Sequence, residues 1–481
     1  MKVAIIGGGI AGLATAFHLQ QLGKGQIEYT LIDNASRFGG KIASVTENGF
    51  VVEGGPDSFM TQKVAGLELC RAVGLEKELM GTNQVARKVF VWSDGRLQPM
   101  PDGVTLIIPT KITPFLKSTL LTWPGKLRMG LDLFIPKRKN DDDESLAHFI
   151  RRRLGNEALD RIAAPMIAGI YVADAEALSL KSTFPRFLDM EKKYGSLLGG
   201  MLYQKYEAAR AKWKARKSGG VSKTPPPGFM TLKSGLQGLP EAIVARLDPK
   251  ALLPNRTVTS IQHNGSEYDL VLSDGTHLSV DALVFATPAY VTAQLLRRLD
   301  STLAEKLQKI RYVSTATVSL GFKRSEVEHP LSGFGFVVSR SEKRKLMACA
   351  WSSTKFNNRT PDDKHVLIRA FVGGANAEGL AEQNETALVK MVRDEMQETL
   401  GITATPVITK VYRWHKANPQ YDVGHDLRIA EIERLTAQHS GLYLAGAAYH
   451  GVGVPDCIAD GKRVAQEIVA KMNTVPTKVR T

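Results

Sequence analysis

The chain of 481 residues is too long for a single simple core, so we expect roughly two or three domains. Its hydrophobic fraction of 43% and charged fraction of 23% are those of a globular protein. The net charge of +15 favours an anionic partner, but there is no zinc-finger, helix-turn-helix or RNA-binding signature, so nucleic acid is not expected.

The cysteines and the hydropathy of the chain limit the cellular compartments in which we expect the protein. Cys70, Cys349 and Cys457 are far apart and form no C-x-x-C, which excludes a disulfide framework and a thiolate metal cluster. No apolar run reaches the length of about 18 residues that a spanning helix needs. The first residues read as a strand and not as a cleaved signal peptide. We therefore expect a cytoplasmic protein without a metal, which is in peripheral contact with a membrane surface at most.

The N-terminal residues predict a strand, a glycine turn and a helix. Residues 2–6 are mostly β-branched or apolar, as in a buried parallel strand, and residues 13–20 favour a helix. Between them stands Gly7-x-Gly9-x-x-Gly12. In a dinucleotide-binding turn these glycines allow the tight turn, the approach of a pyrophosphate and the close packing of the helix. The pyrophosphate then lies at the helix N-terminus, where backbone N–H groups are free.

The glycine motif is also common in ordinary turns, so the residues that follow it decide whether it indicates a dinucleotide-binding site. The predicted strand 29–33 ends in Asp33, 21 positions after Gly12. This is the spacing of a carboxylate that binds ribose hydroxyls. The run Arg37-Phe-Gly-Gly-Lys41 follows, and Glu53-Gly-Gly-Pro-Asp57 comes soon after. These doublets resemble the signature of flavoproteins with two dinucleotide-binding domains, which bind FAD and not NAD.

The next segments lead into a second domain. The loop after residue 53 and a helix predicted over 63–74 are expected to cover the flavin end of such a cofactor. Lys63 lies at the mouth of this loop, either as a cation of the site or as an ordinary surface lysine. Residues 88–108 predict β-structure with Asp94-Gly95 as a hairpin turn, so the second domain is expected to begin there.

Residues 109–228 predict a helical insertion punctuated by prolines. The segment 110–136 mixes apolar residues and Trp123 with lysine and arginine, which fits either an anionic membrane surface or a core with its basic residues outward. The apolar run 164–173 is too short to span a bilayer, and Gly169 would let a flat ligand approach the backbone. Residues 207–228 are first basic and then rich in Gly, Ser and Pro, which predicts a mobile linker.

The nucleotide-binding pattern resumes at residue 229, with a strand, a glycine turn and a helix to 243 and then a β-meander. Residues 300–435 predict an antiparallel sheet with a helix over 385–400. A strand at 441–446 is followed by Gly451-Val-Gly-Val-Pro-Asp-Cys457, which begins a helix to about 472. The positive end of this helix would favour a reduced, anionic flavin.

Over nearly its whole length, the chain resembles the FAD-dependent protoporphyrinogen and coproporphyrinogen oxidases, in particular the coproporphyrinogen III oxidase type of Gram-positive bacteria. The motifs that carry the resemblance lie at 54–59, 108–115, 169–174, 178–185, 413–415 and 451–457. The last motif is specific within the superfamily. Relatives more often carry Glu at the position of Asp33, which keeps the carboxylate, and often Tyr at the position of Phe371.

The resemblance implies a mixed α/β (α+β) fold. This is a two-dinucleotide-binding-domain flavoprotein with a discontinuous Rossmann-like FAD domain, an antiparallel-sheet substrate domain and a helical insertion. The expected FAD segments are 1–87, 229–299 and 436–481, and the substrate domain takes 88–108 and 300–435. The insertion, 109–228, is expected to face a membrane and to form a substrate tunnel.

The resemblance also implies site residues. Substrate contacts are expected at Gly169 and Tyr171, and Lys63 is expected to face a propionate or the flavin. The expected FAD contacts are Gly7, Gly8, Gly9, Ile10, Ala11, Gly12, Asp33, Asn34, Lys41, Gly55, Pro56, Asp57, Ser58, Val258, Trp414, Val452, Gly453 and Val454.

The implied reaction removes six electrons from coproporphyrinogen III in three two-electron steps. Flavin N5 takes hydride from the macrocycle, and O2 reoxidises the flavin with release of hydrogen peroxide. The protein then supplies position, exclusion of water and anion binding, so no strong base is needed. The implied setting is haem biosynthesis, with other enzymes of that pathway as partners.

Other functions stay open. Protoporphyrinogen IX is the alternative substrate. A flavin amine oxidase or a carotenoid desaturase shares the fold, and an amine oxidase needs an aromatic cage, of which Tyr449 is one candidate wall. A non-enzymatic porphyrin carrier is a further alternative, against which the intact flavin loops at both ends of the chain argue.

Overall fold

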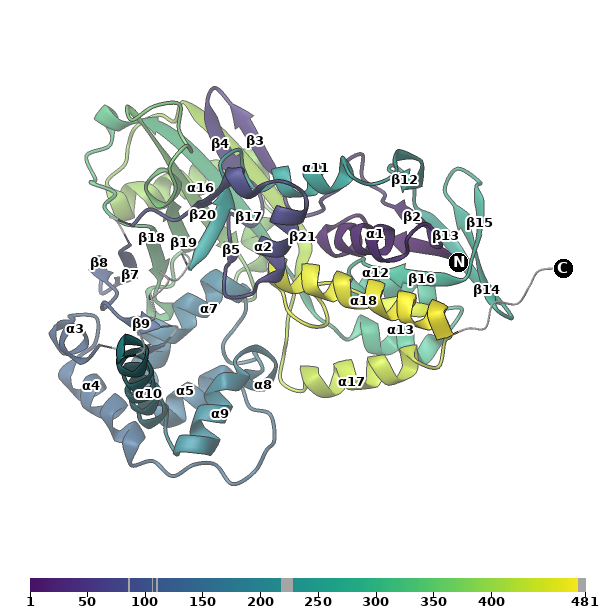
Figure 1. Cartoon of the computed structure of the whole chain (residues 1–481). Coiled ribbons are helices and arrows are strands. Elements are labelled where there is room, and N and C mark those ends of the chain that lie inside the picture. Colours follow the sequence, from purple (N-terminus) through teal and green to yellow (C-terminus); the bar gives the residue numbers. More distant parts are fainter. Residues whose placement is uncertain (85–86, 106, 110, 218–227, 475–481) are drawn as a thin grey trace. The chain divides into compact units, whose positions relative to one another are not determined.

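The computed structural model describes residues 1–84, 87–105, 107–109, 111–217 and 228–474. The chain forms two compact units, each assembled from separate segments (Figure 1). Unit 1 comprises Met1–Thr82, Gly228–Tyr312 and Leu427–Thr481, and unit 2 comprises Asn83–Pro227 and Val313–Asp426. The FAD segments predicted from the sequence have borders after residues 87, 228, 299 and 435, and the segments of unit 1 have borders after residues 82, 227, 312 and 426. The cofactor and substrate roles given to those segments stay predictions.

Unit 1 is built on a five-stranded parallel sheet in the order β12-β2-β1-β16-β22. Its strands are β1 (Lys2–Ile6), β2 (Glu28–Ile32), β12 (Leu252–Leu253), β16 (Ala282–Phe285) and β22 (Leu442–Leu444). Strand β1 is buried on both faces, since Val3 and Ile5 join one hydrophobic core while Ala4 and Ile6 join another. A strand covered on both sides reads as a continuous apolar run, which is the pattern of residues 2–6.

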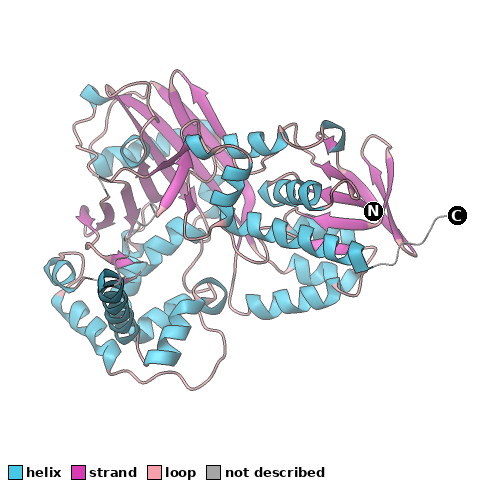
Figure 2. Ribbon diagram, in the orientation of Figure 1, coloured by secondary structure: helices cyan, strands magenta, loops and turns pink. Residues whose placement is uncertain are grey.

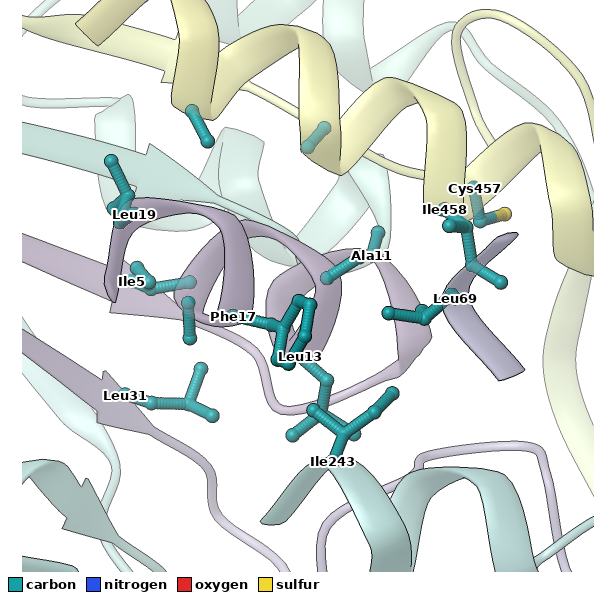
Figure 3. Close-up of a cluster of buried hydrophobic side chains, with 14 of the residues drawn as sticks. Ile5, Ala11, Leu13, Phe17, Leu19, Leu31, Leu69, Ile243, Cys457 and Ile458 are labelled. Carbon is teal, nitrogen blue, oxygen red and sulfur yellow. The ribbon is translucent and has the colours of Figure 1, made fainter. Parts of the chain in front are cut away.

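Helices pack on one face of this sheet, and a meander with further helices packs on the other. The first face carries α1 (Ile10–Leu22), α2 (Ala65–Ala72), α11 (Gly238–Val244) and α18 (Val454–Thr474), whose side chains meet around Phe17 (Figure 3). The second face carries β13 (Val258–Asn264), β14 (Glu267–Leu272), β15 (His277–Val280), α12 (Ala289–Leu296), α13 (Ser301–Gln308) and α17 (His425–Thr436). Helices α1 and α18 are in close contact, because a Cβ atom at Gly461 would lie 2.5 Å from the carbonyl oxygen of Ala11.

Short elements complete unit 1. They are β3 (Ser44–Glu47), β4 (Phe50–Glu53), β5 (Phe59–Met60), η1 (Glu76–Glu78), β6 (Leu79–Gly81), β11 (Phe229–Leu232) and η4 (Pro249–Ala251). Strand β11 pairs with both β5 and β6, so the segment that begins at residue 228 returns directly to the N-terminal one.

Unit 2 is built on a seven-stranded sheet in the order β21-β17-β20-β19-β18-β7-β8. Its strands are β7 (Val89–Ser93), β8 (Arg96–Pro99), β17 (Tyr312–Lys323), β18 (Gly335–Val338), β19 (Leu346–Trp351), β20 (His365–Gly373) and β21 (Ile408–Pro419). Helix α16 (Glu385–Leu400) packs on one face through Leu388 and Val392. The antiparallel sheet predicted over residues 300–435 is confirmed for β17, β20, β19 and β18, whereas β7 of the earlier hairpin joins β18 in parallel. That pair joins the hairpin of residues 89–99 to the later strands.

Helices form the rest of unit 2 (Figure 2). They are α3 (Ile112–Lys117), α4 (Trp123–Gly130), η2 (Leu131–Leu133), α5 (Leu146–Arg153), α6 (Asn156–Ala158), η3 (Leu159–Ala163), α7 (Ala164–Tyr171), α8 (Leu180–Thr183), α9 (Pro185–Tyr194) and α10 (Leu197–Lys217). The remaining short elements are β9 (Val104–Thr105), β10 (Ile108–Pro109), η5 (Arg324–Glu326), η6 (Arg340–Glu342), α14 (Ser352–Lys355) and α15 (Glu378–Ala381). No helix among the described residues is both long enough and apolar enough to cross a bilayer.

The linker predicted over residues 207–228 is wrong in its first part, because residues 207–217 continue α10. Ala, Glu, Lys and Arg dominate that stretch, and all four favour a helix whatever their charge. The remainder of the prediction, 218–227, lies outside the described residues. Helix α7, which covers most of the apolar run 164–173, is not fully buried, since Ile170 is 52% exposed.

Candidate functional site

The glycine turn after β1 and Asp33 after β2, both predicted to hold a dinucleotide, lie at one edge of the unit 1 sheet. Strands β1, β2 and β16 are parallel and adjacent, so their carboxyl ends share this edge. The chain leaves β1 toward β2 on one side, while β16 lies on the other. Such a switch in strand order opens a crevice in which nucleotides bind in doubly wound folds. A Cβ atom at Gly7 would lie 2.8 Å from Ala286, which follows β16.

The turn after β1 depends on its glycines. Gly7 has a φ of +109°, which side chains disfavour, and its N–H donates to the carbonyl of Ile32 over 2.8 Å. At Gly12 a Cβ atom would lie 1.9 Å from the carbonyl oxygen of Gly7, so the helix can approach the strand only without a side chain there. At Gly9, in contrast, an added Cβ atom meets no atom of the chain within 4 Å.

The N-terminus of α1 is suited to an anion. Its N-cap residue, Gly9, has no side chain to accept from the first N–H groups, and the first turn contains no acidic residue. The free N–H groups and the helix dipole favour negative charge at this point. Gly9, Ile10, Ala11 and Gly12 therefore form a cradle that fits a pyrophosphate.

Asp33 is held in place beside this turn. Its two carboxylate oxygens accept from the backbone N–H of Gly8 (2.5 Å) and of Ala35 (2.8 Å). Each oxygen keeps a further lone pair for a hydroxyl donor. The side chain is only partly buried, and the neighbouring Asn34 is exposed, so both are accessible to a ligand. The predicted contact between this carboxylate and a ribose is therefore chemically sound.

The loop after Asp33 folds back over the glycine turn. The N–H of Gly39 donates to the carbonyl of Gly8 over 2.8 Å, and a Cβ atom at Gly40 would lie 3.1 Å from Cα of Gly9. The Arg37 guanidinium holds the loop closed, because it donates to the carbonyls of Gly40 and Ile42, each over 3.0 Å. Arg37 belongs to the motif 37–41, and these hydrogen bonds give it the role of stabilising the loop.

Lys41 and Gly55 lie at the far end of the same loop. A Cβ atom at Gly55 would lie 1.8 Å from the carbonyl oxygen of Lys41, so the two segments are in backbone contact. Burial lowers the pKa of Lys41 to about 8, and the thiol of Cys457 on α18 is its electrostatic neighbour. Burial also raises the pKa of Cys457 to about 12, which keeps that thiol neutral. Lys41 is half-buried at this end of the loop, where the predicted contact with FAD stays a prediction.

The C-terminal glycine loop completes the edge. Gly451 has a φ of +131°, and Asp456 in the first turn of α18 accepts from the N–H of Gly453 over 3.2 Å. The predicted site cation Lys63 forms an ion pair with Asp456 over 2.6 Å, with 49% of its side chain exposed. The pair ties the loop before α2 to the loop before α18. The sequence offered no signal for it, because the partners are 393 positions apart.

The remaining predicted FAD contacts come from several other parts of the chain. Pro56, Asp57 and Ser58 follow Gly55, with the Ser58 hydroxyl donating to Asp57 over 2.6 Å. Val258 is buried at a bulge of β13, and Val452 and Val454 flank Gly453 in unit 1. Trp414 belongs to unit 2, where its ring stacks on Tyr412. Its contact with FAD stays a prediction.

The predicted substrate residues lie on α7 of unit 2. An added Cβ atom at Gly169 would come within 3.5 Å of Val337, so the helix is close to strand β18 at this residue. The Tyr171 ring meets Phe184 edge to face, with ring centroids 5.5 Å apart. These contacts place a glycine and an aromatic ring beside the sheet, which is consistent with a planar ligand without identifying one.

Two residues of unit 1 turn out to be structural. Glu53 is 5% exposed and accepts from the Ser44 hydroxyl (2.5 Å) and from the N–H of Leu236 (3.0 Å). Tyr449 is 6% exposed and belongs to the hydrophobic core beneath the sheet. Only a small part of this ring is therefore accessible to a ligand.

Three comparisons place these features among known proteins. The chain matches the family model of flavin-containing amine oxidoreductases over residues 10–469. It is 37% identical to the coproporphyrinogen III oxidase of Bacillus subtilis, with 97% of each chain covered, and 34% identical to that of Staphylococcus aureus, with 98% and 99% covered. A crystal structure from Exiguobacterium, named as a candidate protoporphyrinogen oxidase, superposes with a TM-score of 0.86 and 31% identity over 98% of this chain and 99% of that one.

Proposed function

The chain belongs to the family of flavin-containing amine oxidoreductases, and on that premise we propose that it oxidises coproporphyrinogen III to coproporphyrin III in haem biosynthesis. Two relatives that share 37% and 34% of its residues over almost the whole chain are named for this activity, and that observation carries the proposal. The chain is an oxidoreductase, and its cofactor is FAD. We take O2 as the electron acceptor and hydrogen peroxide as the second product.

The unit 1 edge supplies groups that suit each part of FAD. The open cradle at Gly9 and the uncapped N-terminus of α1 suit the pyrophosphate, and Asp33 suits the ribose. Lys41 and the loop 451–454 are proposed to line the flavin end. When bound, FAD supplies the two-electron acceptor that each step of porphyrinogen oxidation requires.

The chain's own contribution is to bind and orient the macrocycle and to exclude water. Gain of aromaticity drives the oxidation, and the ring N–H groups can exchange protons without help, so the absence of a base dyad from the proposed residues is consistent with the reaction. We propose that unit 2 receives the substrate, with Gly169 and Tyr171 of α7 against its flat face.

Charge favours the substrate with more carboxylates. Coproporphyrinogen III carries four propionates, whereas protoporphyrinogen IX carries two, and the chain has a net charge of +15. Each charge-assisted hydrogen bond to a carboxylate contributes roughly 1.5–3 kcal/mol before desolvation. Protoporphyrinogen IX remains the second candidate, because the similar Exiguobacterium structure is named for it.

Turnover by the purified holoprotein tests the proposal. Coproporphyrinogen III in aerated buffer should gain porphyrin fluorescence and release hydrogen peroxide in proportion to enzyme. Protein stripped of FAD should be inactive, and it should recover activity when FAD is restored. A holoprotein with full flavin absorbance that leaves the porphyrinogen unoxidised would reject the enzyme and favour a porphyrin carrier.

Partners beyond substrate and O2 stay proposals. The enzyme would receive a porphyrinogen from one reaction of haem biosynthesis and pass a porphyrin to another. A porphyrinogen is oxidised by O2 to the porphyrin, so direct transfer between pathway enzymes would protect it. Peripheral contact with a membrane is a separate proposal, and it depends on the surface of unit 2.

A further inference from the structure

The first turn of helix α18 holds a carboxylate inside the C-terminal glycine loop. An added Cβ atom at Gly451 would lie 2.6 Å from Cγ of Asp456, and one at Gly453 would lie 2.9 Å from its carboxylate oxygen Oδ2. The same oxygen accepts from the N–H of Gly453 over 3.2 Å. The loop therefore closes around this carboxylate, and side chains at the two glycines would displace it.

The carboxylate changes the charge that α18 presents to a ligand. The N-terminus of a helix is the positive end of its dipole, and an acidic side chain in the first turn compensates that charge. Asp456 is such a residue in α18, whereas the first turn of α1 contains no acidic residue. For α18 to favour a reduced, anionic flavin, as its dipole alone would predict, a further positive charge is needed.

Lys63 supplies that charge from the loop before α2. Its ammonium donates over 2.6 Å to Oδ2 of Asp456, the oxygen that also accepts from Gly453. The two helices are in contact at the same place, since an added Cβ atom at Gly66 of α2 would lie 3.3 Å from Cγ of Pro455 in α18. The packing of α2 on α18 thus keeps the ammonium beside the glycine loop, where the ion pair as a whole is neutral.

The two partners of the pair differ in exposure. The Lys63 side chain is 49% exposed, whereas that of Asp456 is 15% exposed. Solvent and salt screen a partly buried charge less than an exposed one, so the carboxylate acts strongly on groups near it. Charges close to a flavin tune how readily it accepts electrons. A carboxylate without a counter-ion in this loop would oppose the negative charge that reduction adds, and Lys63 removes that opposition.

We propose that Lys63 and Asp456 form a charge-balancing pair that sets the reduction potential of the bound flavin. The inference rests on the proposed function, in which the loop 451–454 lines the flavin end of FAD. Both are positioning residues in this role, because each acts through its charge and neither has to touch the reacting atoms. Loss of Lys63 leaves a carboxylate that disfavours reduction, and loss of Asp456 leaves an ammonium that favours it.

The midpoint potential of the FAD-loaded full chain, measured anaerobically against a dye of known potential, tests the proposal. Lys63→Gln should lower the potential and Asp456→Asn should raise it, because the two changes remove charges of opposite sign. We expect each to change the two-electron reduction equilibrium roughly tenfold or more, which corresponds to a shift of about 30 mV or more. The double variant should return close to the wild-type potential, because the loop is neutral again. Lys63→Glu, which reverses the charge, should lower the potential further than Lys63→Gln.

Two variants serve as controls. Lys63→Arg keeps the charge and should leave the potential unchanged. Lys462→Gln makes the same chemical change in the Lys462–Glu68 pair, which joins the same two helices over 3.5 Å with its side chains 40% and 55% exposed. Solvent and salt screen that pair, so this variant should also keep the wild-type potential.

The pattern of signs decides the outcome. Flavin absorbance and melting temperature show that each variant is folded and loaded. Single variants that shift the potential in the same direction, a double variant that does not return, or Lys63 variants with full flavin content and unchanged potential would overturn the proposal. A wild-type holoprotein that fails to oxidise coproporphyrinogen III would instead reject the proposed function, and the potentials would still test the pair.

Discussion

The glycine-lined edge of unit 1 and the helical part of unit 2 use side chains in opposite ways. At the edge, the site depends on side chains that are missing: Gly12 lets two backbones touch, and Gly9 leaves open space above the helix N-terminus. In the helical part, the large side chains of Trp123 and Phe134 face outward, while Asp132 of the same segment is buried in its pair with Arg153. The first arrangement follows from local backbone geometry, whereas the second follows from contacts between distant residues. The sequence therefore reveals the first far more readily.

The largest effect is expected from a pair of substitutions that separates fold from cofactor. Gly12→Val would push a side chain into the carbonyl of Gly7 and should prevent folding or destabilise the protein by about 3 kcal/mol or more. Gly9→Ala adds a Cβ atom that meets no atom of the chain within 4 Å, so the apoprotein should melt close to the wild type while FAD binding falls by roughly a hundredfold. Flavin absorbance per protein and apoprotein melting temperatures measure both. A Gly9→Ala protein with full flavin content would refute the cradle.

The helical part should respond most strongly at Arg153. This guanidinium is fully buried and donates to Asp132 and to the carbonyls of Ile135 and Gly195. Arg153→Met would leave the Asp132 carboxylate without its ion-pair partner and should cost about 3–5 kcal/mol of unfolding free energy. Arg153→Met combined with Asp132→Leu should recover much of that loss. Urea unfolding gives these values, and a single variant as stable as the wild type would show that the pair does not fix η2.

The stability of the apoprotein should depend on pH through Lys41, at the glycine-lined edge of unit 1. Burial lowers the pKa of Lys41 to about 8, from the 10.5 that is ordinary for an exposed lysine. Below pH 8 the group is protonated in both states, whereas between pH 8 and 10.5 only the unfolded chain keeps the proton. The apoprotein should therefore gain stability as pH rises through that window. The Lys41→Met variant should lack this gain, and the difference between the two unfolding curves isolates it. Parallel curves would show that Lys41 titrates normally.

The smallest effect on stability is expected at Lys63. Its pair with Asp456 is half exposed, so Lys63→Ala should cost less than about 1 kcal/mol. Its effect on catalysis is the informative part. If Lys63 faces a propionate, kcat/KM should fall more for coproporphyrinogen III than for protoporphyrinogen IX. An equal loss on both would assign Lys63, through Asp456 and the loop at Gly453, to the flavin side. Lys63→Arg is the control that keeps the charge.

The fold class and the flavoprotein family are confirmed, and so are several elements in detail. Helix α16 was predicted to the residue, because its ends are signalled locally: the Asn384 side chain caps the start, and Gly401 ends the helix with a φ of +68°. The Asp94-Gly95 hairpin has the two positive φ angles that this dipeptide favours. Strand β1 was equally clear, since burial on both faces leaves a continuous apolar run.

The remainder was not predictable from local patterns. The extent of α10 differs from the prediction, because basic residues occur both in linkers and in helices, and here they are good helix formers. The contact between Lys63 and Asp456 and the network of Asp132 with Arg153 join residues that are distant in the chain. A pattern read along the sequence contains no trace of such pairs. The outward face of α4 depends on one of them, which is why residues 110–136 allowed two interpretations.

The most direct measurement of the central claim compares the two porphyrinogens. Initial rates of the FAD-loaded protein, taken aerobically at one ionic strength, give kcat/KM for coproporphyrinogen III and for protoporphyrinogen IX. Two additional propionates, each able to accept a charge-assisted hydrogen bond, predict a preference of roughly tenfold or more for coproporphyrinogen III. Equal values, or a preference for protoporphyrinogen IX, would contradict the account.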